Sequence, residues 1–289
     1  MKRSVIIIFI MLAGLGVLAY PTISNYLSEK NGSYAIATYE EAVANEDEQA
    51  IQAAWDEAVR YNESLSGQPV HDPFLEGTGM AMQDNYNEVL KLNDTMGYVE
   101  IPKISVNLPI YHGTADEVLQ KGVGHLEGSS IPVGGEGTHS VLTGHTGLTH
   151  AKIFTDLTEL GKDDLFYVHV LNQTLAYRVD QIKVIEPENT DDLRRVDGMD
   201  YCTLLTCTPY AVNSHRLLVR GVRTEYIPEE KEAITPVSSG TDEDRIVLIV
   251  AVIATAVMVA VVIFALHIHR RRMEKQERIR RMRQEIGKW

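Results

Sequence analysis

The chain has 289 residues, enough for one medium-sized domain with appended segments, and its formal net charge is −13 at pH 7. Its last 23 residues carry nine Lys/Arg against three Asp/Glu, and two more basic residues begin the chain, so the body between holds 16 basic and 37 acidic residues. Such an acidic body excludes a nucleic acid as partner, because it has little positive charge with which to neutralise phosphates.

Two apolar segments flank this body. Residues 4–20 (SVIIIFIMLAGLGVLAY) follow Met1-Lys2-Arg3, which is the layout of a signal peptide or of a signal anchor. The run ends in Tyr20-Pro21 rather than in small residues, which favours an anchor over residues 1–22. Near the other end, Ile246 to Leu266 is 21 residues long without a charge and predicts a transmembrane helix.

The basic residues beside these segments predict their orientation. Lys/Arg-rich flanks stay on the cytoplasmic side of a membrane, so both termini are expected in the cytoplasm and the body outside the cell membrane. The tail, residues 267–289, would then meet anionic lipid headgroups.

The first part of the body, residues 23–79, is predicted as a helical extension that ends in a loop. Its segment 38–62 (TYEEAVANEDEQAIQAAWDEAVRYN) has the periodicity of one or two amphipathic helices. Residues 63–79 (ESLSGQPVHDPFLEGTG) collect Gly, Pro, Ser and Asp, which predicts an irregular loop.

Residues 80–225 predict a mainly β domain. The expected elements, in chain order, are two short strands around a turn (97–113), a short helix (115–127), a strand (139–144), a hairpin with a long second strand (165–187), and two further strands (203–207 and 216–226). Short strands punctuated by Gly, Pro and Asn, without βαβ alternation, predict a β-barrel or a β-sandwich. Residues 226–245 have the composition of a linker before the apolar span.

The chain has only two cysteines, Cys202 and Cys207, in the strand-like run YCTLLTC. An offset of five places them on opposite faces of a strand, with Cα atoms roughly 16 Å apart, which is beyond disulfide reach. A free thiol outside the cytoplasm is unusual and suggests a nucleophile for Cys207. A cysteine in an apolar strand is otherwise a core residue.

A nucleophilic thiol needs a base and a source of positive charge. His145 ends an apolar strand between glycines (TGHTG), and Arg216 begins the strand after Cys207. If the Cys207 and Arg216 strands pair antiparallel, these side chains can meet at one rim of the barrel. The alternatives are a turn residue for His145 and an ordinary strand-end arginine for Arg216. The spacing of His139, His145 and His150 matches no zinc-ligand pattern.

Residues 203–221 (TLLTCTPYAVNSHRLLVRG) resemble the signature of the sortases, most closely the class C sortases that polymerise pilins in Gram-positive bacteria. The motif TGHTGL (143–148), the run 97–135 and the tetrapeptide HDPF (71–74) agree with it, so the resemblance covers residues 30–225. It implies a sortase-type closed β-barrel of about eight strands with short helices, an N-terminal helical and lid extension, and transmembrane helices at the ends.

The resemblance also implies roles for individual residues. Cys207 would be the nucleophile, His145 the acid/base, and Arg216 the group that holds substrate and stabilises the oxyanion. HDPF resembles the class C lid, in which Asp72 would pair with Arg216 and Phe74 would lie over the Cys207 sulfur. The family often carries Gly-Ile-Asn where this chain has Ala211-Val212-Asn213, and Arg where it has Thr146, which is expected to affect the sorting signal accepted.

The implied function is that of a cysteine transpeptidase without metal or organic cofactor. It would cleave an LPxTG-like sorting signal through a Cys207 thioester and join it to a lysine amine of another pilin, so its partners would be pilins and membrane lipids. Three alternatives remain: a sortase that attaches proteins to peptidoglycan, a cysteine protease that hydrolyses its thioester, and a doubly anchored binding protein with an inert Cys207.

Overall fold

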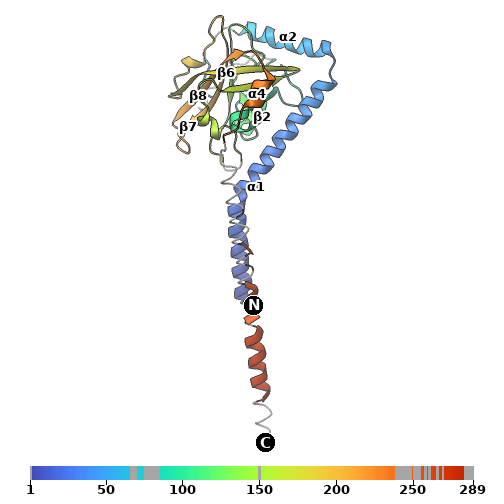
Figure 1. The fold of residues 1–289 in the computed structure, drawn as a ribbon, viewed down its shortest axis with the longest axis vertical. Coiled ribbons are helices and arrows are strands. Elements are labelled where there is room, and N and C mark those ends of the chain that lie inside the picture. The colour runs from blue at the N-terminus through green and yellow to red at the C-terminus, as the bar shows by residue number, and fades with distance from the viewer. Residues whose placement is uncertain are drawn as a thin grey trace. The chain divides into compact units, whose positions relative to one another are not determined.

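The computed structural model describes residues 2–65, 70–74, 85–148 and 151–237 without interruption, and separate stretches between 249 and 282 (Figure 1). Contacts divide the chain into two units, one formed by Ser24–Ser239 and the other by the two ends of the chain, Met1–Ile23 and Gly240–Trp289. The first unit holds all the predicted site residues.

The terminal unit contains the start of helix α1 (Lys2–Asn45), which continues into the first unit and includes Pro21. In the part of the chain that the structure describes, no helix is long and apolar enough to cross a membrane. The transmembrane helices predicted at the two ends are therefore not supported by the structure. Most of the predicted span from Ile246 to Leu266 lies outside the described residues.

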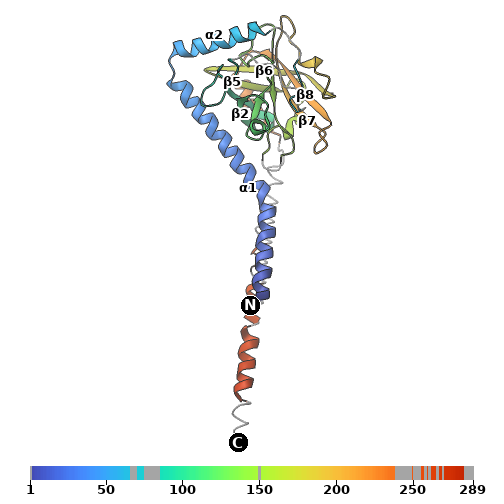
Figure 2. The same ribbon diagram turned by 180° about the vertical axis from the view of Figure 1, so that it is seen from behind.

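The first unit is built on a closed barrel of eight strands, in the order β1-β2-β3-β4-β7-β8-β6-β5, seen from opposite sides in Figures 1 and 2. The strands are β1 (Gly97–Ile101), β2 (Val106–His112), β3 (Val123–His125), β4 (Thr138–Thr143), β5 (Leu165–Val170), β6 (Gln173–Ile185), β7 (Asp200–Thr208) and β8 (His215–Thr224). The closed barrel confirms the predicted fold, and β5 with the 13-residue β6 forms the predicted hairpin.

Short helices connect these strands. They are the single turns η1 (Pro102–Ile104), η2 (Thr155–Glu159) and η3 (Asp191–Leu193), and the helix α3 (Asp116–Leu119) between β2 and β3. The helix predicted over 115–127 is thus shorter than expected, because β3 follows it closely and pairs with β2 and β4.

Alternation of side chains along the strands separates the barrel interior from its outer face. Leu142 of β4, Leu204 of β7 and Val219 of β8 belong to the large interior cluster. Their neighbours one position away, Val141, Leu205 and Leu218, belong to a second cluster, with Val70, Leu126, Ile185, Leu193 and the half-buried Phe74. We call this second set the outer cluster.

Helices α1 and α2 (Glu48–Ser64) form the predicted N-terminal extension and pack against the barrel (Figure 1). The helical structure is interrupted between them. The Asp47 side chain accepts a 2.7 Å hydrogen bond from the Ala50 N–H and so caps the N-terminus of α2. In α1, the buried Tyr39 hydroxyl donates to the Met96 carbonyl and accepts from the Leu171 N–H. This residue therefore fixes α1 to the start of β1 and to the β5–β6 turn.

The end of α2 is held in place from two sides. Asn62 is buried and exchanges two hydrogen bonds with the backbone of Ile131, at 3.0 and 2.7 Å. Arg195 donates to the carbonyls of Asn62, Leu65 and Gly137. The chain thus leaves α2 at Leu65, toward the HDPF segment, from a fixed point on the barrel.

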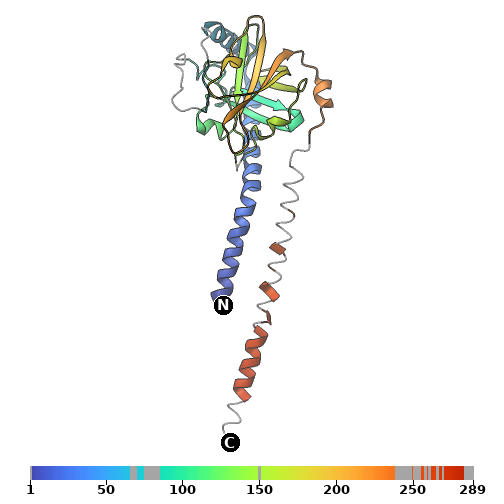
Figure 3. The same cartoon turned by 90° about the vertical axis from the view of Figure 1, so that its left-hand side faces the viewer.

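Part of the predicted linker, residues 226–245, packs on the barrel. It contains the helix α4 (Pro228–Ala233), seen in orange in Figure 3. Lys231 forms a 2.6 Å ion pair with Glu100 of β1, Tyr226 and Ile234 pack on a small apolar cluster around Tyr167, and the Val237 N–H donates to the Lys103 carbonyl. Composition suggested a linker because most of these residues are polar, whereas the anchoring contacts are made by a few of them.

Two buried histidines should make the free energy of unfolding depend on pH. Burial lowers the pKa of His125 and of His139 from 6.5 to about 4, so the folded protein binds fewer protons than the unfolded chain between these values. The free energy of unfolding should therefore fall as the pH falls from 6.5 to 4, by on the order of 3 kcal/mol for each histidine. Urea denaturation at pH 7 and pH 4.5 measures this loss.

Substitution of one of the two histidines shows whether it causes this loss. His139→Gln should flatten the pH dependence of the free energy of unfolding relative to the unmodified protein. Equal denaturation midpoints at the two pH values in the unmodified protein would contradict the prediction.

Candidate active site

Three of the predicted site residues come together on the outer face of the barrel. Cys207 pairs directly with Arg216 in the antiparallel register of β7 and β8, as the sequence predicted. Cys207 is two residues from Leu205 and Arg216 two residues from Leu218, so both side chains share the face of the outer cluster. Cys202 lies on the other face, fully buried in the interior, and both cysteines are free thiols.

His145 reaches the same place from the other side of β7. Strand β4 runs parallel to β7 with Thr143 opposite Leu205, and the Gly144 N–H donates to the Leu205 carbonyl at 3.0 Å. Continuing this register by two residues places His145 beside Cys207. The Phe154 N–H donates to the His145 carbonyl at 3.0 Å and holds the strand end in place.

A glycine is required immediately before His145. A Cβ atom at Gly144 would lie 2.7 Å from the buried ring of Phe154 and 2.8 Å from the side chain of Ile153. Gly144 therefore allows the segment after His145 to fold back against the end of β4, which fixes the backbone that carries the imidazole.

Asp72 forms an ion pair with the guanidinium of Arg216, which confirms the predicted pairing. Arg216 Nε and Nη2 donate to the two carboxylate oxygens of Asp72 at 2.5 and 3.0 Å, in the bidentate geometry that suits a planar fork. Nη1 donates to the carbonyls of Asn213 and His215, each at 3.1 Å. Both charged side chains are almost fully buried, with 5% and 2% of their surfaces exposed.

Phe74 covers the two residues that flank Cys207. Its ring centre lies 5.0 Å from the Arg216 guanidinium carbon and 5.4 Å from the centre of the His145 ring. Its N–H donates to Asp72 Oδ1 at 2.8 Å, so the two residues form one compact turn. The expected position of this ring over the sulfur of Cys207 stays a prediction. The ring contacts His145 and Arg216, which lie on the two sides of Cys207.

The buried thiol is held in its neutral form in this arrangement. Burial raises the pKa of Cys207 to about 11, the Arg216 charge opposes this rise, and Asp72 adds to it. Asp72 thus acts against the thiolate, because it places a negative charge near the sulfur and neutralises the nearest cation. The arrangement with the HDPF segment in place is one in which the thiol is unreactive.

One further contact at this site was not predicted from the sequence. Asp116 Oδ1, at the start of α3, lies 3.5 Å from His145 Nε2. The two residues are 29 positions apart, and nothing in the run ADEVL distinguishes this carboxylate from any other acidic residue at the beginning of a helix. Only the pairing of β3 with β4 brings α3 to the histidine.

The loop between β7 and β8 adopts left-handed backbone angles that suit Asn213 but not Ala211. Ala211 and Asn213 have φ of 63° and 58°, in the left-handed region that glycine and asparagine prefer. Ala211 stands where the family often has glycine, so this loop carries a small strain. The Tyr210 ring packs on Gly147 of the TGHTGL motif, where a Cβ atom would approach it to 3.0 Å.

The described residues contain no group of three His, Cys, Asp or Glu side chains able to hold a metal ion. His139 uses both ring nitrogens in structural contacts, one with the Arg194 carbonyl at 2.9 Å and one with the Thr203 hydroxyl at 2.7 Å. His150 lies outside the described residues.

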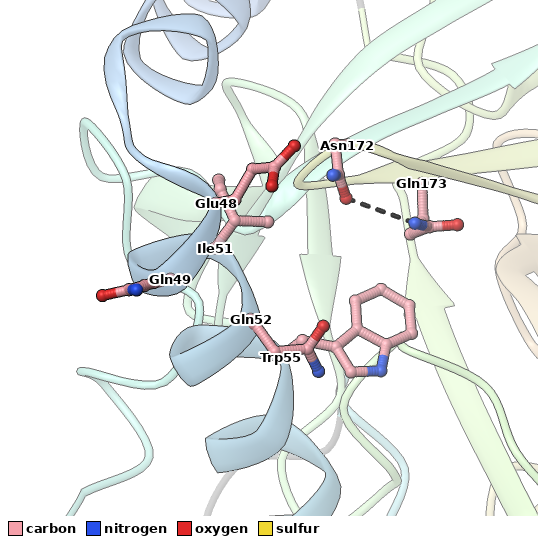
Figure 4. A pocket seen from close by; sticks show the side chains of 7 residues that line it. All are labelled: Glu48, Gln49, Ile51, Gln52, Trp55, Asn172 and Gln173. Carbon is pink, nitrogen blue, oxygen red and sulfur yellow. Dashed lines mark hydrogen bonds between the residues drawn. The ribbon is translucent and has the colours of Figure 1, made fainter.

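A groove of about 640 Å³ between α2 and the β5–β6 turn contains none of the residues discussed above (Figure 4). Its lining consists of Glu48, Gln49, Ile51, Gln52, Trp55, Asn172 and Gln173. Of these, Ile51 belongs to the interior cluster and Trp55 packs against it. The groove therefore follows the packing contact between the helical extension and the barrel.

Comparison with known proteins agrees with this geometry. Residues 99–224 match the sortase domain. Sortase D of Bacillus subtilis is 31% identical over 115 residues, which are 40% of this chain and 55% of that protein, so the chain spans about half the length of this curated relative.

Solved structures cover more of the chain. Sortase C-1 of Streptococcus pneumoniae is 52% identical with a TM-score of 0.63, covering 66% of this chain and 98% of that one. A pilus-related sortase C of Group B Streptococcus is 43% identical with a TM-score of 0.62, covering 66% and 97%. Because a chain with the closed barrel aligns at this identity with nearly the whole of each structure, the protein belongs to the sortase family and, within it, to the class C sortases.

Proposed function

We propose that the protein is a transpeptidase that joins pilin subunits through a thioester on Cys207. The observation that carries this proposal is the position of Cys207 between His145 and Arg216 on one face of the barrel, next to a turn whose Asp72 pairs with the arginine. A thiol, an imidazole and a fixed cation in this order suit acyl transfer, in which charge develops on a carbonyl oxygen.

In the first half-reaction, the Cys207 thiolate attacks the carbonyl carbon of the threonine in an LPxTG-like sorting signal. The carbonyl π electrons move to oxygen, and Arg216 stabilises this oxyanion. When the oxyanion collapses, the Thr–Gly C–N bond breaks and His145, as imidazolium, gives its proton to the leaving amine. The products are a thioester on Cys207 and a free amino terminus.

In the second half-reaction, a lysine ε-amine of another pilin attacks the thioester carbonyl. His145, now neutral, takes a proton from this amine, and the C–S bond breaks to restore the thiolate. The new C–N bond is an isopeptide bond between two subunits. Water competes for the same thioester, so positioning of the amine decides between transfer and hydrolysis.

The HDPF segment acts in this scheme as a lid that must leave before substrate binds. Asp72 fills the fork that a substrate carbonyl or oxyanion would use, and Phe74 covers His145 and Arg216. Release of the lid exposes Cys207 to water and frees the charge of Arg216. Both changes favour the thiolate, so opening the lid also activates the nucleophile.

Pilins with a C-terminal sorting signal are proposed as substrates because similar solved structures include a pilus-related sortase C of Group B Streptococcus and a sortase C of Streptococcus pneumoniae that was studied for its pilin substrate specificity. We place the barrel on the outer side of the cell membrane, with both termini in the cytoplasm. The support is the apolar runs at 4–20 and 246–266 with their basic flanks.

The acyl-enzyme provides the direct test of this function. The full chain carrying Asp72→Ala and Phe74→Ala is incubated with a panel of LPxTG-type peptides and examined by intact mass. We expect an adduct equal in mass to the acyl part of the peptide, which Cys207→Ala abolishes and Cys202→Ala leaves in place. No adduct from a folded protein, or one that persists in Cys207→Ala, would refute the mechanism.

Opening the lid should make Cys207 reactive. With Asp72→Ala and Phe74→Ala, the thiol loses both the cover and the opposing carboxylate, so its pKa should fall from about 11. Alkylation of Cys207 by iodoacetamide at pH 8 should accelerate roughly 10- to 100-fold, because each unit of pKa changes the thiolate fraction about tenfold. Peptide mass spectrometry follows the labelling of Cys207, with buried Cys202 as internal reference.

The neighbouring His71→Ala, at an exposed position, is the control and should leave the rate unchanged. Equal labelling of the closed and open variants would show that the turn does not protect the thiol.

The guanidinium fork of Arg216 should be needed as well as its charge. In the lid-open background, Arg216→Lys should lower the rate of thioester formation about 10²- to 10³-fold, because an ammonium cannot reproduce the bidentate contact with the oxyanion. Arg220→Lys is the matched control, since Arg220 lies on the same face of β8 and pairs with Asp180 instead. Single-turnover kinetics measure both, and full activity in Arg216→Lys would contradict the assigned role.

A further inference from the structure

The contact between Asp116 and His145 brings a second carboxylate to the candidate active site. Asp72 pairs with Arg216. Asp116 instead approaches His145, the proposed acid/base, with 3.5 Å between its Oδ1 and His145 Nε2. The imidazole is 20% exposed and the carboxylate 74% exposed. The pair therefore lies at the border between the lid and solvent.

Asp116 is held by its own helix rather than projecting freely. Gln120 Nε2 donates to Asp116 Oδ2 at 2.5 Å, which leaves the other carboxylate oxygen facing the histidine. Leu119, one turn along, is buried against Gly124 of β3, where a Cβ atom would lie 2.9 Å from its methyl group. Before the helix, the Thr114 hydroxyl donates to Glu127 at 2.9 Å.

The barrel register explains why this helix meets the histidine. Strand β3 pairs antiparallel with β4, with Gly124 opposite Thr143 and His125 opposite Leu142. Continuing that register by two residues places Gly122 opposite His145, so the end of α3 lies beside the end of β4. His145 is thus flanked by β7 with Cys207 on one side and by α3 with Asp116 on the other.

The elements packed around His145 carry other charged and titratable groups. Cys207 and Arg216 lie on β7 and β8, and Asp72 lies in the lid, engaged with Arg216. The segment whose Phe154 N–H donates to the His145 carbonyl carries Lys152 and Asp156. From α3, Asp116 forms an ion pair with His145.

We propose that Asp116 is a positioning residue, which holds the imidazole of His145 and favours its protonated form. This inference rests on the proposed function, in which His145 gives a proton to the leaving amine and then accepts one from the attacking amine. A nearby carboxylate stabilises the imidazolium, and an imidazolium beside Cys207 in turn stabilises the thiolate.

The opposing interpretation is an exposed ion pair without consequence, since such pairs contribute little and are screened by salt. The contact differs from an ordinary surface pair because one member is the acid/base and the other is fixed by Gln120. It remains on the wet side of the site, so its effect should be moderate and should weaken in high salt.

The test compares Asp116→Asn with Glu117→Gln in the full chain that carries the lid-open substitutions. The titration midpoint of His145 is followed by NMR of ¹³C-labelled histidine, with the signal assigned from its loss in His145→Gln. Asp116→Asn should lower the midpoint by roughly 0.2–0.7 pH unit at low ionic strength and by less in 1 M NaCl. Glu117→Gln, on the next residue of the same helix, should not change it.

Kinetics provide the second measurement. Asp116→Asn should lower kcat/KM for a sorting-signal peptide at neutral pH by about 2- to 5-fold, should shift the alkaline limb of the pH profile to lower pH, and should be partly rescued by Asp116→Glu. An unchanged His145 midpoint in Asp116→Asn, or an equal shift in Glu117→Gln, would overturn the proposal. The titration needs no turnover, so it fails or succeeds separately from the thioester test on Cys207.

Discussion

The register of β7 between its two neighbours is the constraint on which the site depends. β4 runs parallel to β7 and β8 runs antiparallel to it, so two independent pairings bring His145 and Arg216 to Cys207. A slip of β7 by one residue would turn Cys207 into the interior and leave Leu204 facing outward. The packing of the interior cluster therefore enforces the alignment of the three candidate catalytic residues.

The buried pair of Asp72 and Arg216 opposes catalysis in the closed arrangement. Removing either partner from a buried ion pair typically costs about 3–5 kcal/mol, because the remaining charge stays without water. In the proposed opening, the lid segment leaves as a whole, so Asp72 returns to solvent while Arg216 becomes accessible to water, and this cost is reduced. The same geometry that suits a carboxylate also suits an oxyanion, which explains how one arginine can serve both the closed state and the reaction.

Secondary-structure elements that depend on local residue patterns, such as the β5–β6 hairpin and the N-terminal helices, could be predicted from the sequence. The run of residues 165–187 predicted a hairpin with a long second strand, and the periodicity of residues 38–62 predicted one or two amphipathic helices, of which the structure has two. The choice between barrel and sandwich could not be made from the residues, since it depends on pairing β1 with β5 and β6 with β8, which are distant in the chain. The family resemblance supplied that choice.

Within the site, Cys207, His145 and Arg216 stood out because their residue types and strand ends carry a chemical meaning. Asp116 carried none, because its role depends on where β3 places α3. Likewise, Lys231 gave no sign that it would anchor α4 to Glu100.

Arg195 anchors the chain at Leu65, shortly before the lid segment. Asp72 is therefore an intramolecular ligand of Arg216, and any other ligand must compete with it. Asp72 lies only seven residues beyond this fixed point, so its effective concentration at Arg216 is set by a short connection and not by the amount of protein present. Dilution of the protein would leave the closed fraction unchanged. A ligand of this site can displace the lid only through its higher affinity for the open state, so the strength of its contacts with the open site, rather than the amount of protein, determines the open fraction at a given ligand concentration.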